Sequence, residues 1–275
     1  MRSVMTSAAW IGLAVSAAGV PLFAQLQDNS EKQMTCANSG YDNDRVRHCE
    51  IREQSLPSIG RLSIDAGQNG GTTVKGWMRG DVLVRARIET AADNEAAASI
   101  IASRVMIDGS GGQVRAVGPE QLNNSWWSVS YEIFVPQVID LSLKSNNGGL
   151  NVSDVRGQIH FDANNGGVHL KRVVGDVSGG TVNGGIQVEL AGAIFDGRQM
   201  ELSTHNGGVT VAMPSHYSAR IQAETGMGRI QSDFPLPQSI DGRSHKLDFS
   251  VGSGGPPIHI TTGNGSIRLK RTDSQ

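Results

Sequence analysis

Two cysteines near the start of the chain are the residues whose type and spacing favour covalent chemistry. Cys36 and Cys49 are the only cysteines, and they flank a polar, turn-prone stretch. In an exported protein such a pair indicates a disulfide, worth about 3 kcal/mol for a loop of this length. With His48 the thiols would supply three zinc ligands, one fewer than a structural site needs. We therefore predict a Cys36–Cys49 disulfide and no metal ion there.

Histidines in the second half of the chain suggest zinc binding. His160 and His169 are predicted at outward positions on neighbouring strands, and His205 follows in the same region. A surface zinc pair is one interpretation of this spacing. The other is that the imidazoles are simply solvated, which is the usual state of histidines on a strand surface. We favour the second interpretation.

Acidic side chains of the same region suggest calcium or glycoside chemistry. Glycine-rich β-rolls bind calcium through an Asp at a fixed position of every repeat, but Asp154, Asp162 and Asp176 occupy different positions of the repeat unit. A polysaccharide hydrolase or lyase would need paired acids in a cleft. The candidate acids near an insertion in the repeat are Glu189, Asp196 and Glu201. No nucleophile-elbow motif occurs, and we predict no cofactor and no enzymatic activity.

The aromatic pair Trp126-Trp127 is the candidate for stacking on a ligand. Adjacent residues of a strand point to opposite faces, so we expect one indole in the core and the other at the surface. An exposed indole would stack on a sugar or a partner protein. The alternative is a packing role in an edge strand or loop.

The element that must position these side chains is a repeat built on Asn-Gly-Gly. The string recurs twice with a step of 18 residues, and the fourth copy follows after 23 because about five residues are inserted near 193–197. Looser copies lie at 69–71, 226–230 and 263–269, and the last two are expected to be irregular or to cap the array. The turn residues are Asn147, Gly148, Gly149, Asn165, Gly166, Gly167, Asn183, Gly184, Gly185, Asn206, Gly207 and Gly208.

An apolar–polar–apolar triplet follows each turn and indicates a short strand. Apolar pairs such as Leu150 and Val152 are predicted to face a narrow aliphatic core, with residues such as Asn151 forming an outward polar column. A second turn about nine residues later completes a coil of about 18 residues, and stacked coils make a β-solenoid. We expect the glycines to supply positive φ at the turns and the asparagines to form a hydrogen-bond ladder.

Upstream of the repeat, the pattern indicates a β-rich region with one helix. The β pattern begins at Leu56, and alternating residues predict strands over 82–89 and 128–135. Asp93 or Asn94 is placed to cap a helix over 95–104. The polar stretch before Leu56 offers little core, so the disulfide is expected to stabilise it.

The N-terminus has the pattern of a secretory signal. Arg2 precedes an apolar run from Ala8 to Phe23, and the chain turns polar at Gln25. This pattern predicts cleavage after Ala24. The alternative is an uncleaved anchor, for which the run is short. No second run of spanning length follows, so we expect an exported protein, periplasmic or extracellular, with no membrane span after cleavage.

Composition excludes several other classes. The chain has 35 glycines in 275 residues, 18% charged and 5% aromatic residues. Glycine does not recur every third residue, which excludes collagen, and the low charge content excludes a disordered tail. A formal net charge of −2 without a basic block excludes nucleic acid as a partner.

The repeats, the His48-Cys49-Glu50 motif and the segment at 232–236 resemble the bacterial putative-adhesin family of β-strand repeats, a domain of unknown function. The likeness covers most of the chain after residue 24, including 82–107 and 129–133. The resemblance implies an exported single-sheet coil or β-helix-like fold and an adhesin-like role. It implies no catalytic residues.

The sequence thus predicts a mainly all-β chain with a short α-helix near 94–104. Its parts are a signal peptide (1–24), a polar segment with a disulfide (25–56), a β-rich region (57–136) and the repeat solenoid (137–271). We predict a non-enzymatic adhesin or envelope-surface binding module whose ligand is a glycan or a protein. The alternatives are a self-associating envelope-stress protein, whose strand edges pair with further copies, and a polysaccharide hydrolase or lyase.

Overall fold

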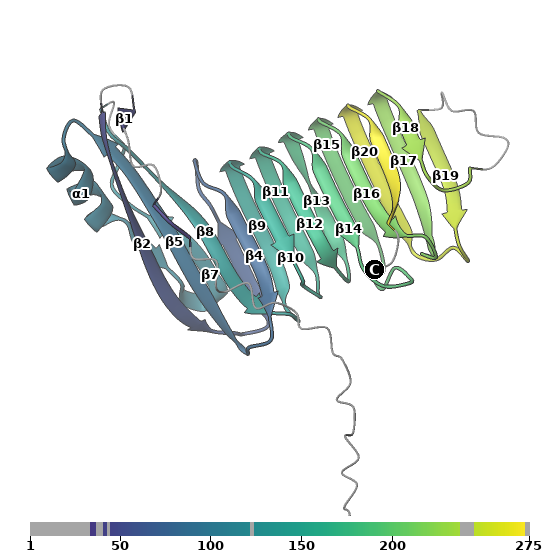
Figure 1. The fold of residues 1–275 in the computed structure, drawn as a ribbon, viewed down its shortest axis with the longest axis horizontal. Coiled ribbons are helices and arrows are strands. Elements are labelled where there is room, and N and C mark those ends of the chain that lie inside the picture. Colours follow the sequence, from purple (N-terminus) through teal and green to yellow (C-terminus); the bar gives the residue numbers. More distant parts are fainter. Residues whose placement is uncertain (1–33, 37–40, 43–44, 122–123, 237–244, 273–275) are drawn as a thin grey trace, which may run out of the picture.

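The computed structural model describes residues 34–36, 41–42, 45–121, 124–236 and 245–272, so the predicted signal peptide lies outside the described residues. The described chain forms two large β-sheets and one α-helix, α1 (Glu95–Arg104) (Figure 1). A mainly β chain with one short helix is therefore confirmed. The single sheet that the family resemblance implies is wrong, because the strands divide between two sheets. Within this part of the chain, no helix is both long and apolar enough to cross a membrane.

One sheet contains eleven of the described strands, with parallel and antiparallel neighbours. In spatial order they are β1 (Tyr41–Asp42), β2 (Arg45–Pro57), β5 (Asp81–Ala92), β8 (Trp126–Pro136), β4 (Thr72–Trp77), β10 (Leu150–Ser153), β12 (Val168–Val173), β14 (Ile186–Leu190), β16 (Val209–Pro214), β21 (Ile267–Thr272) and β18 (Ile230–Ser232).

The other sheet contains ten described strands and is also mixed. In spatial order they are β19 (Lys246–Val251), β17 (Ala219–Met227), β20 (Pro257–Asn264), β15 (Met200–Asn206), β13 (Val177–Asn183), β11 (Ile159–Asn165), β9 (Asp140–Asn147), β3 (Arg61–Asp65), β7 (Gln113–Val117) and β6 (Met106–Asp108).

The Asn-Gly-Gly repeat alternates between the two sheets. Strands β9, β11, β13 and β15 lie in the ten-stranded sheet, and β10, β12, β14 and β16 lie in the eleven-stranded sheet. Neighbouring strands pair in parallel, so that Leu150 stands beside Val168 and Val168 beside Ile186. One repeat therefore adds one strand to each sheet.

The first glycine of each Asn-Gly-Gly turn is required because the coils stack closely. A Cβ on Gly166 would lie 2.1 Å from the carbonyl oxygen of Gly148, and one on Gly184 would lie 2.0 Å from that of Gly166. None of the glycines in the four Asn-Gly-Gly turns has a positive φ. The expectation of positive φ is therefore wrong: these positions need a missing side chain, not a left-handed backbone.

The predicted asparagine ladder is confirmed and is longer than expected. Each Nδ2 donates to the Oδ1 of the asparagine in the preceding coil of the stack, over 2.8 Å from Asn165 to Asn147 and over 2.8 Å from Asn183 to Asn165. The ladder begins at Asn69 and ends at Asn264. Side-chain amides thus connect successive coils in one direction along the array.

A second set of polar contacts lies just inside the ladder and was not predicted. Thr181, Thr204 and Thr262 are buried, and each hydroxyl donates to a glycine carbonyl of the adjacent turn at 2.8–3.0 Å. Ser145 does the same at Gly70. The signal in the sequence is a Ser or Thr two residues before the asparagine, although the second repeat has Ala163 there.

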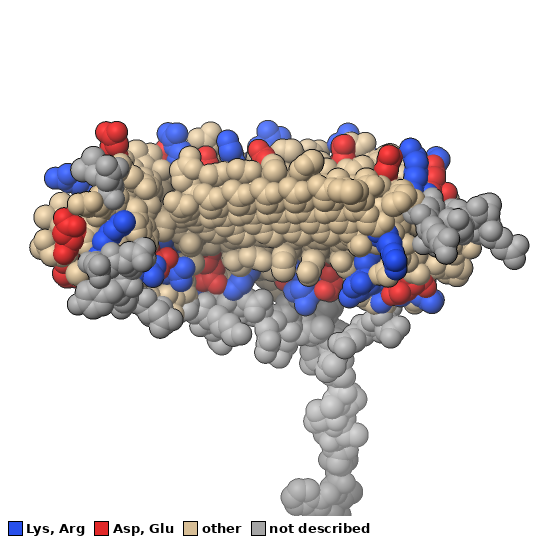
Figure 2. Space-filling model, turned by 90° about the horizontal axis from the view of Figure 1, so that it is seen from above, with Lys and Arg blue, Asp and Glu red and all other residues tan. Residues whose placement is uncertain are grey.

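The two rims of the repeat, where the chain passes between the sheets, differ in charge. Figure 2 shows a central band across the repeat without charged side chains, bordered on both sides by Lys, Arg, Asp and Glu. We call this band the Asn-Gly-Gly rim; its turns are 146–149, 164–167, 182–185 and 205–208. We call the opposite rim the charged rim; its turns are 154–158, 172–176 and 191–199.

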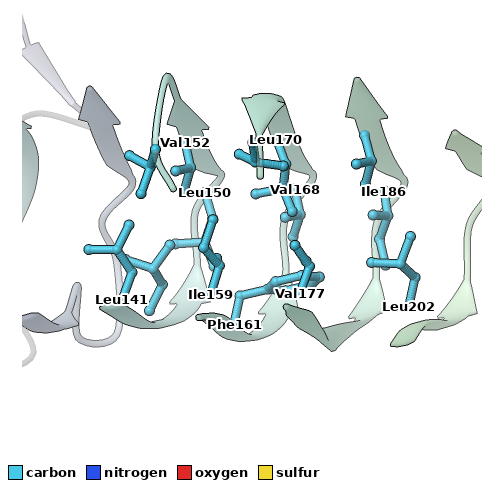
Figure 3. Packing of buried hydrophobic residues seen from close by; sticks show 14 of the residues in the cluster. Leu141, Leu150, Val152, Ile159, Phe161, Val168, Leu170, Val177, Ile186 and Leu202 are labelled. Carbon is cyan, nitrogen blue, oxygen red and sulfur yellow. The ribbon is translucent and has the colours of Figure 1, made fainter. Parts of the chain in front are cut away.

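The core lies between the sheets and is almost entirely aliphatic in the repeat. Figure 3 shows side chains such as Val168 and Leu170 from the eleven-stranded sheet meeting Ile159 and Val177 from the ten-stranded sheet. The predicted inward pairs are all buried. Phe161 is the aromatic ring in Figure 3, and Gly179 makes room for it, since a Cβ there would lie 2.7 Å from the ring.

The C-terminal coils do not stack in chain order. Strand β20 lies between β15 and β17, and β21 lies between β16 and β18. The copy at 263–269 is therefore a regular inner coil, and the copy at 226–230 is the outermost. The antiparallel strand β19 then covers β17.

The N-terminal region extends the eleven-stranded sheet. Strand β2 pairs with β5 from Val46 to Pro57, so the prediction that the β pattern begins at Leu56 is wrong. Charged residues along β2 obscure the alternation. The helix prediction is confirmed: Asn94 caps α1 by accepting from the Ala97 N–H, and Ala98 and Ala102 are buried.

Candidate binding groove

The predicted disulfide is present between Cys36 and Cys49. His48 lies beside it, but its Nδ1 is 2.7 Å from a carboxylate oxygen of Glu95 at the start of α1. Arg52 donates to the Ala102 carbonyl at the other end of the helix, at 2.8 Å. His48 and Arg52 of β2 therefore hold the two ends of α1 in place.

Trp126 and Trp127 begin β8, and neither indole is freely exposed. Trp127 packs against the core, and its Nε1 donates to the Pro119 carbonyl at 2.8 Å. The Arg47 guanidinium lies 5.5 Å from the ring centroid of Trp126. The prediction of one buried and one exposed indole is wrong, since both residues are half-buried.

The histidines do not converge. His160 lies on β11 of the ten-stranded sheet and His169 on β12 of the eleven-stranded sheet, so they are exposed on opposite faces of the molecule. His205 is exposed on β15. Among the described residues, no group of three or more His, Cys, Asp or Glu is arranged to hold a metal ion. The interpretation as a zinc pair is wrong.

Two of the aspartates considered for calcium are held by arginines. Arg172 binds the carboxylate of Asp154 at 2.6 Å, and Arg198 binds that of Asp176 at 2.7 Å. Burial alone would raise the pKa of Asp176, but hydrogen bonds from the backbone and side chain of Arg198 outweigh it and lower this pKa below its ordinary value.

The three acids considered for glycoside chemistry also lie apart. Glu189 is 3.9 Å from Lys171 on the eleven-stranded sheet, and Asp196 binds Arg156 on the charged rim. Glu201 is exposed on β15 of the ten-stranded sheet. They do not form the pair of facing carboxyl groups that hydrolysis of a glycoside requires.

The outer face of the ten-stranded sheet is hollowed along β13. Two hollows, of about 410 and 500 Å³, lie there, and a third of about 460 Å³ adjoins them at the turns of the charged rim. The first two share Asp140 and Asp176, and the first and third share His160 and Ser178. They therefore form one groove that runs from the charged rim along the strand. We call it the β13 groove.

Small residues on β13 create this groove. The outward positions Ser178 and Gly180 are flanked by His160 and Asp162 on β11, and by Glu201 and Ser203 on β15. Gly180 also leaves room for its neighbour, because a Cβ there would lie 2.5 Å from the Ser203 hydroxyl. The floor is thus one strand wide, between walls of larger polar side chains.

The groove changes in character along its length. Near the charged rim its charges are paired, as in Arg198 with Asp176. In the middle, His160 Nδ1 lies 3.1 Å from the Ser178 hydroxyl. Three arginines and five carboxylates line the whole groove, which gives a net charge of −2 with His160 neutral. They are Arg61, Arg156, Arg198, Asp140, Asp162, Asp176, Asp196 and Glu201.

The sequence pattern did not reveal this groove, although it contained the signal. The string Ser178-Gly179-Gly180 interrupts a strand position where the neighbouring repeats carry larger side chains. Glycine in a strand marks a close approach of another group. His160, Asp162 and Glu201 each appeared as separate candidates, and parallel pairing brings them to one face.

No family model matches this chain, and no curated protein matches it. Among solved structures, a putative cell adhesion protein from Clostridium sporogenes ATCC 15579 is 14% identical, with a TM-score of 0.44 over 82% of this chain and 100% of that one. A putative adhesin from Bacteroides fragilis NCTC 9343 is 7% identical, with a TM-score of 0.34 over 82% and 97%. A putative lipid binding protein from Parabacteroides distasonis ATCC 8503 is 11% identical, with a TM-score of 0.31 over 80% and 96%.

Proposed function

We propose that this protein is an exported, non-enzymatic binding module, adhesin-like in role, that holds a polymer of the cell envelope or surface in the β13 groove. The observation that carries the proposal is that two hollows along β13 share lining residues with each other and with a third hollow at the charged rim. Hollows of several hundred Å³ are typical of binding sites. A disulfide is typical of exported proteins, which supports export.

The repeat serves this role as a rigid platform. We propose that the parallel coils constitute a β-solenoid, in which the asparagine ladder and the close glycine contacts hold each coil in register. A groove built on strands is held more precisely than one built on loops. A long ligand would then gain from many weak contacts without a cost of ordering the protein.

The two alternatives have less support. Self-association through strand edges would use an open edge. The edge strand β19 of the ten-stranded sheet is charged, with Lys246 3.2 Å from Glu224 and Asp248 2.8 Å from Arg220. The edge strand β18 of the other sheet has no charge but is only three residues long. Charged side chains on an edge strand oppose pairing with another copy. A hydrolase or lyase would need paired acids, and the candidate acids lie apart.

The test fills the groove without disturbing the core. Ser178→Tyr places a ring on the groove floor, whereas Gln187→Tyr places the same ring on the outward face of β14, on the other sheet. Binding of the purified protein to isolated cell envelopes should fall at least tenfold for Ser178→Tyr and stay unchanged for Gln187→Tyr. Equal binding by both variants would contradict the proposal, and release of soluble sugar from the envelopes would contradict its non-enzymatic part.

A further inference from the structure

We infer that the occupant of the β13 groove is a single extended glycan chain that is uncharged or carries amino groups, and that acidic polymers are excluded. This inference rests on the proposed function, because it names the ligand class of the same groove. It follows from the width of the groove, the kind of hydrogen-bonding groups that line it, and its charge.

The width admits one extended chain and excludes a helix. Strands β11 and β15 are each hydrogen-bonded to β13, so their backbones are about 9.5 Å apart. The side chains of His160 and Glu201 narrow this space further from the two walls. An α-helix with its side chains is about 10–12 Å across, so it cannot lie on the floor. A single polymer chain aligned with β13 fits.

The hydrogen-bonding groups favour a glycan over a peptide. The backbone N–H and C=O groups of β13 are already paired with β11 and β15. Peptides that bind sheets do so at an open edge, where backbone groups are free to pair with theirs. On a sheet face, a peptide would lose water from its own backbone groups without gaining such partners.

Sugar hydroxyls, in contrast, both donate and accept hydrogen bonds, as the lining side chains do. Gln158 and His160 stand on one side, Ser178 on the floor, and Glu201 and Ser203 on the other side. Side-chain amides, carboxylates and hydroxyls of this kind can each bond a hydroxyl group. Val182 is exposed on β13 beyond Gly180, and a single apolar side chain of this kind offers a lipid chain little apolar surface to bury.

Charge selects among glycans. The net charge of −2 opposes an acidic polymer and favours amino groups. Asp162 and Glu201 carry the excess among the lining residues, since neither forms an ion pair within the described residues, whereas the carboxylates near the charged rim face arginines. Lys144 on β9 stands in register beside Asp162, so Glu201 is the carboxylate that is farther from a cation. The selective end of the groove is therefore the end away from the charged rim.

The test uses oligosaccharides of different charge. Titration calorimetry of the purified protein would compare a chitosan oligomer, its N-acetylated chitin counterpart and polygalacturonate. We expect chitosan to bind about tenfold more tightly than chitin, and polygalacturonate not to bind. Asp162→Asn with Glu201→Gln should reduce the preference for chitosan over chitin to about twofold. Glu189→Gln, on the opposite face, should leave the preference intact.

The possible failures are distinguishable. Tighter binding of polygalacturonate than of chitin would overturn the inference about charge, and groove-dependent capture of a protein ligand would overturn the inference about glycans, while the proposed function would stand in both cases. Failure of all three oligosaccharides, together with envelope binding that Ser178→Tyr abolishes, would again contradict only the inference. If Ser178→Tyr does not alter envelope binding, both proposals fail.

Discussion

The two rims of the repeat, one with four turns and the other with three, differ in side-chain chemistry. Along the Asn-Gly-Gly rim, each turn repeats the same side chains, and Gly166 and Gly184 lie against the preceding turn with no room for a Cβ. Along the charged rim, the turns differ in length and composition, and arginine–aspartate pairs such as Arg198–Asp176 replace the ladder. The β13 groove opens at the charged rim.

This difference shows at which positions of a stacked fold the amino-acid type can vary. A position that touches its equivalent in the next coil must suit every coil, so one residue type recurs along the whole rim. The charged rim also has closely stacked glycines, since a Cβ on Gly175 would lie 2.4 Å from the Gly157 carbonyl oxygen. Its other side chains differ from turn to turn, and it accepts an insertion near 193–197. Differences in side chains are therefore concentrated at the charged rim and on the faces, while the Asn-Gly-Gly rim is nearly uniform.

The largest expected effect is at the first glycine of a turn. Gly166→Ala would place a Cβ 2.1 Å from the Gly148 carbonyl oxygen, a backbone atom that cannot rotate away. We expect the free energy of unfolding to fall by about 3 kcal/mol or more, as for severe overpacking. Urea denaturation followed by circular dichroism measures this change.

The matched control is the second glycine of a turn. A Cβ on Gly149 would lie 3.4 Å from the nearest atom, the Gly167 carbonyl oxygen, which is an ordinary contact. Gly149→Ala should therefore change the free energy of unfolding by less than about 1 kcal/mol. If the two variants lose equal stability, glycine is required at these turns for its conformational freedom and not because the coils stack closely.

A smaller effect is expected from the ladder. Asn183 donates to Asn165 and accepts from Asn206, both at 2.8 Å. Asn183→Ala removes both bonds, and we expect a loss of about 1–2 kcal/mol, since one hydrogen bond contributes about 1 kcal/mol. Asn151→Ala, at an exposed outward position, is the control and should cost less than about 0.5 kcal/mol. Equal losses in the same denaturation experiment would mean that the ladder contributes nothing.

The sequence predicts the parts of the fold that depend on residues near each other in the repeat. The inward alternation at Val168 and Leu170, the ladder through Asn165, and the capped helix at Asn94 are all local or periodic, and all are confirmed. The insertion of β20 between β15 and β17 was not predictable, because both orders satisfy the same turn and alternation pattern.

The candidate site was predictable only as unconnected residues. His160, Asp162 and Glu201 carried no motif that joined them, since their proximity arises from parallel pairing across three strands. Trp126 and Trp127 illustrate the opposite error. Their aromatic type suggested that they are exposed for binding. Instead, Trp127 packs against the core and donates to the Pro119 carbonyl, and the Arg47 guanidinium lies near the ring of Trp126.

The smallest predicted effect is a pH dependence confined to the charged rim. Asp176 accepts hydrogen bonds from the backbone and side chain of Arg198, at 2.6 and 2.7 Å, and its folded-state pKa is lowered by them. A carboxylate with a lowered folded-state pKa stabilises the fold above its unfolded pKa of about 3.9 and loses that contribution as the pH falls through the folded-state value. Because Arg198 is largely exposed, we expect only about 0.2–1 kcal/mol.

Amide hydrogen exchange measures this pH effect separately at the two rims. As the pH falls below about 4, the protection factor of the Arg198 amide should decrease, whereas those of the Gly166 and Gly184 amides, which bond to the Asn183 and Asn206 carbonyls, should not. Asp176→Asn should remove the pH dependence at Arg198, since it leaves no carboxyl group to protonate there. A parallel loss of protection at both rims would instead mean that acid opens the whole repeat, and the two rims would then be one cooperative unit despite their different chemistry.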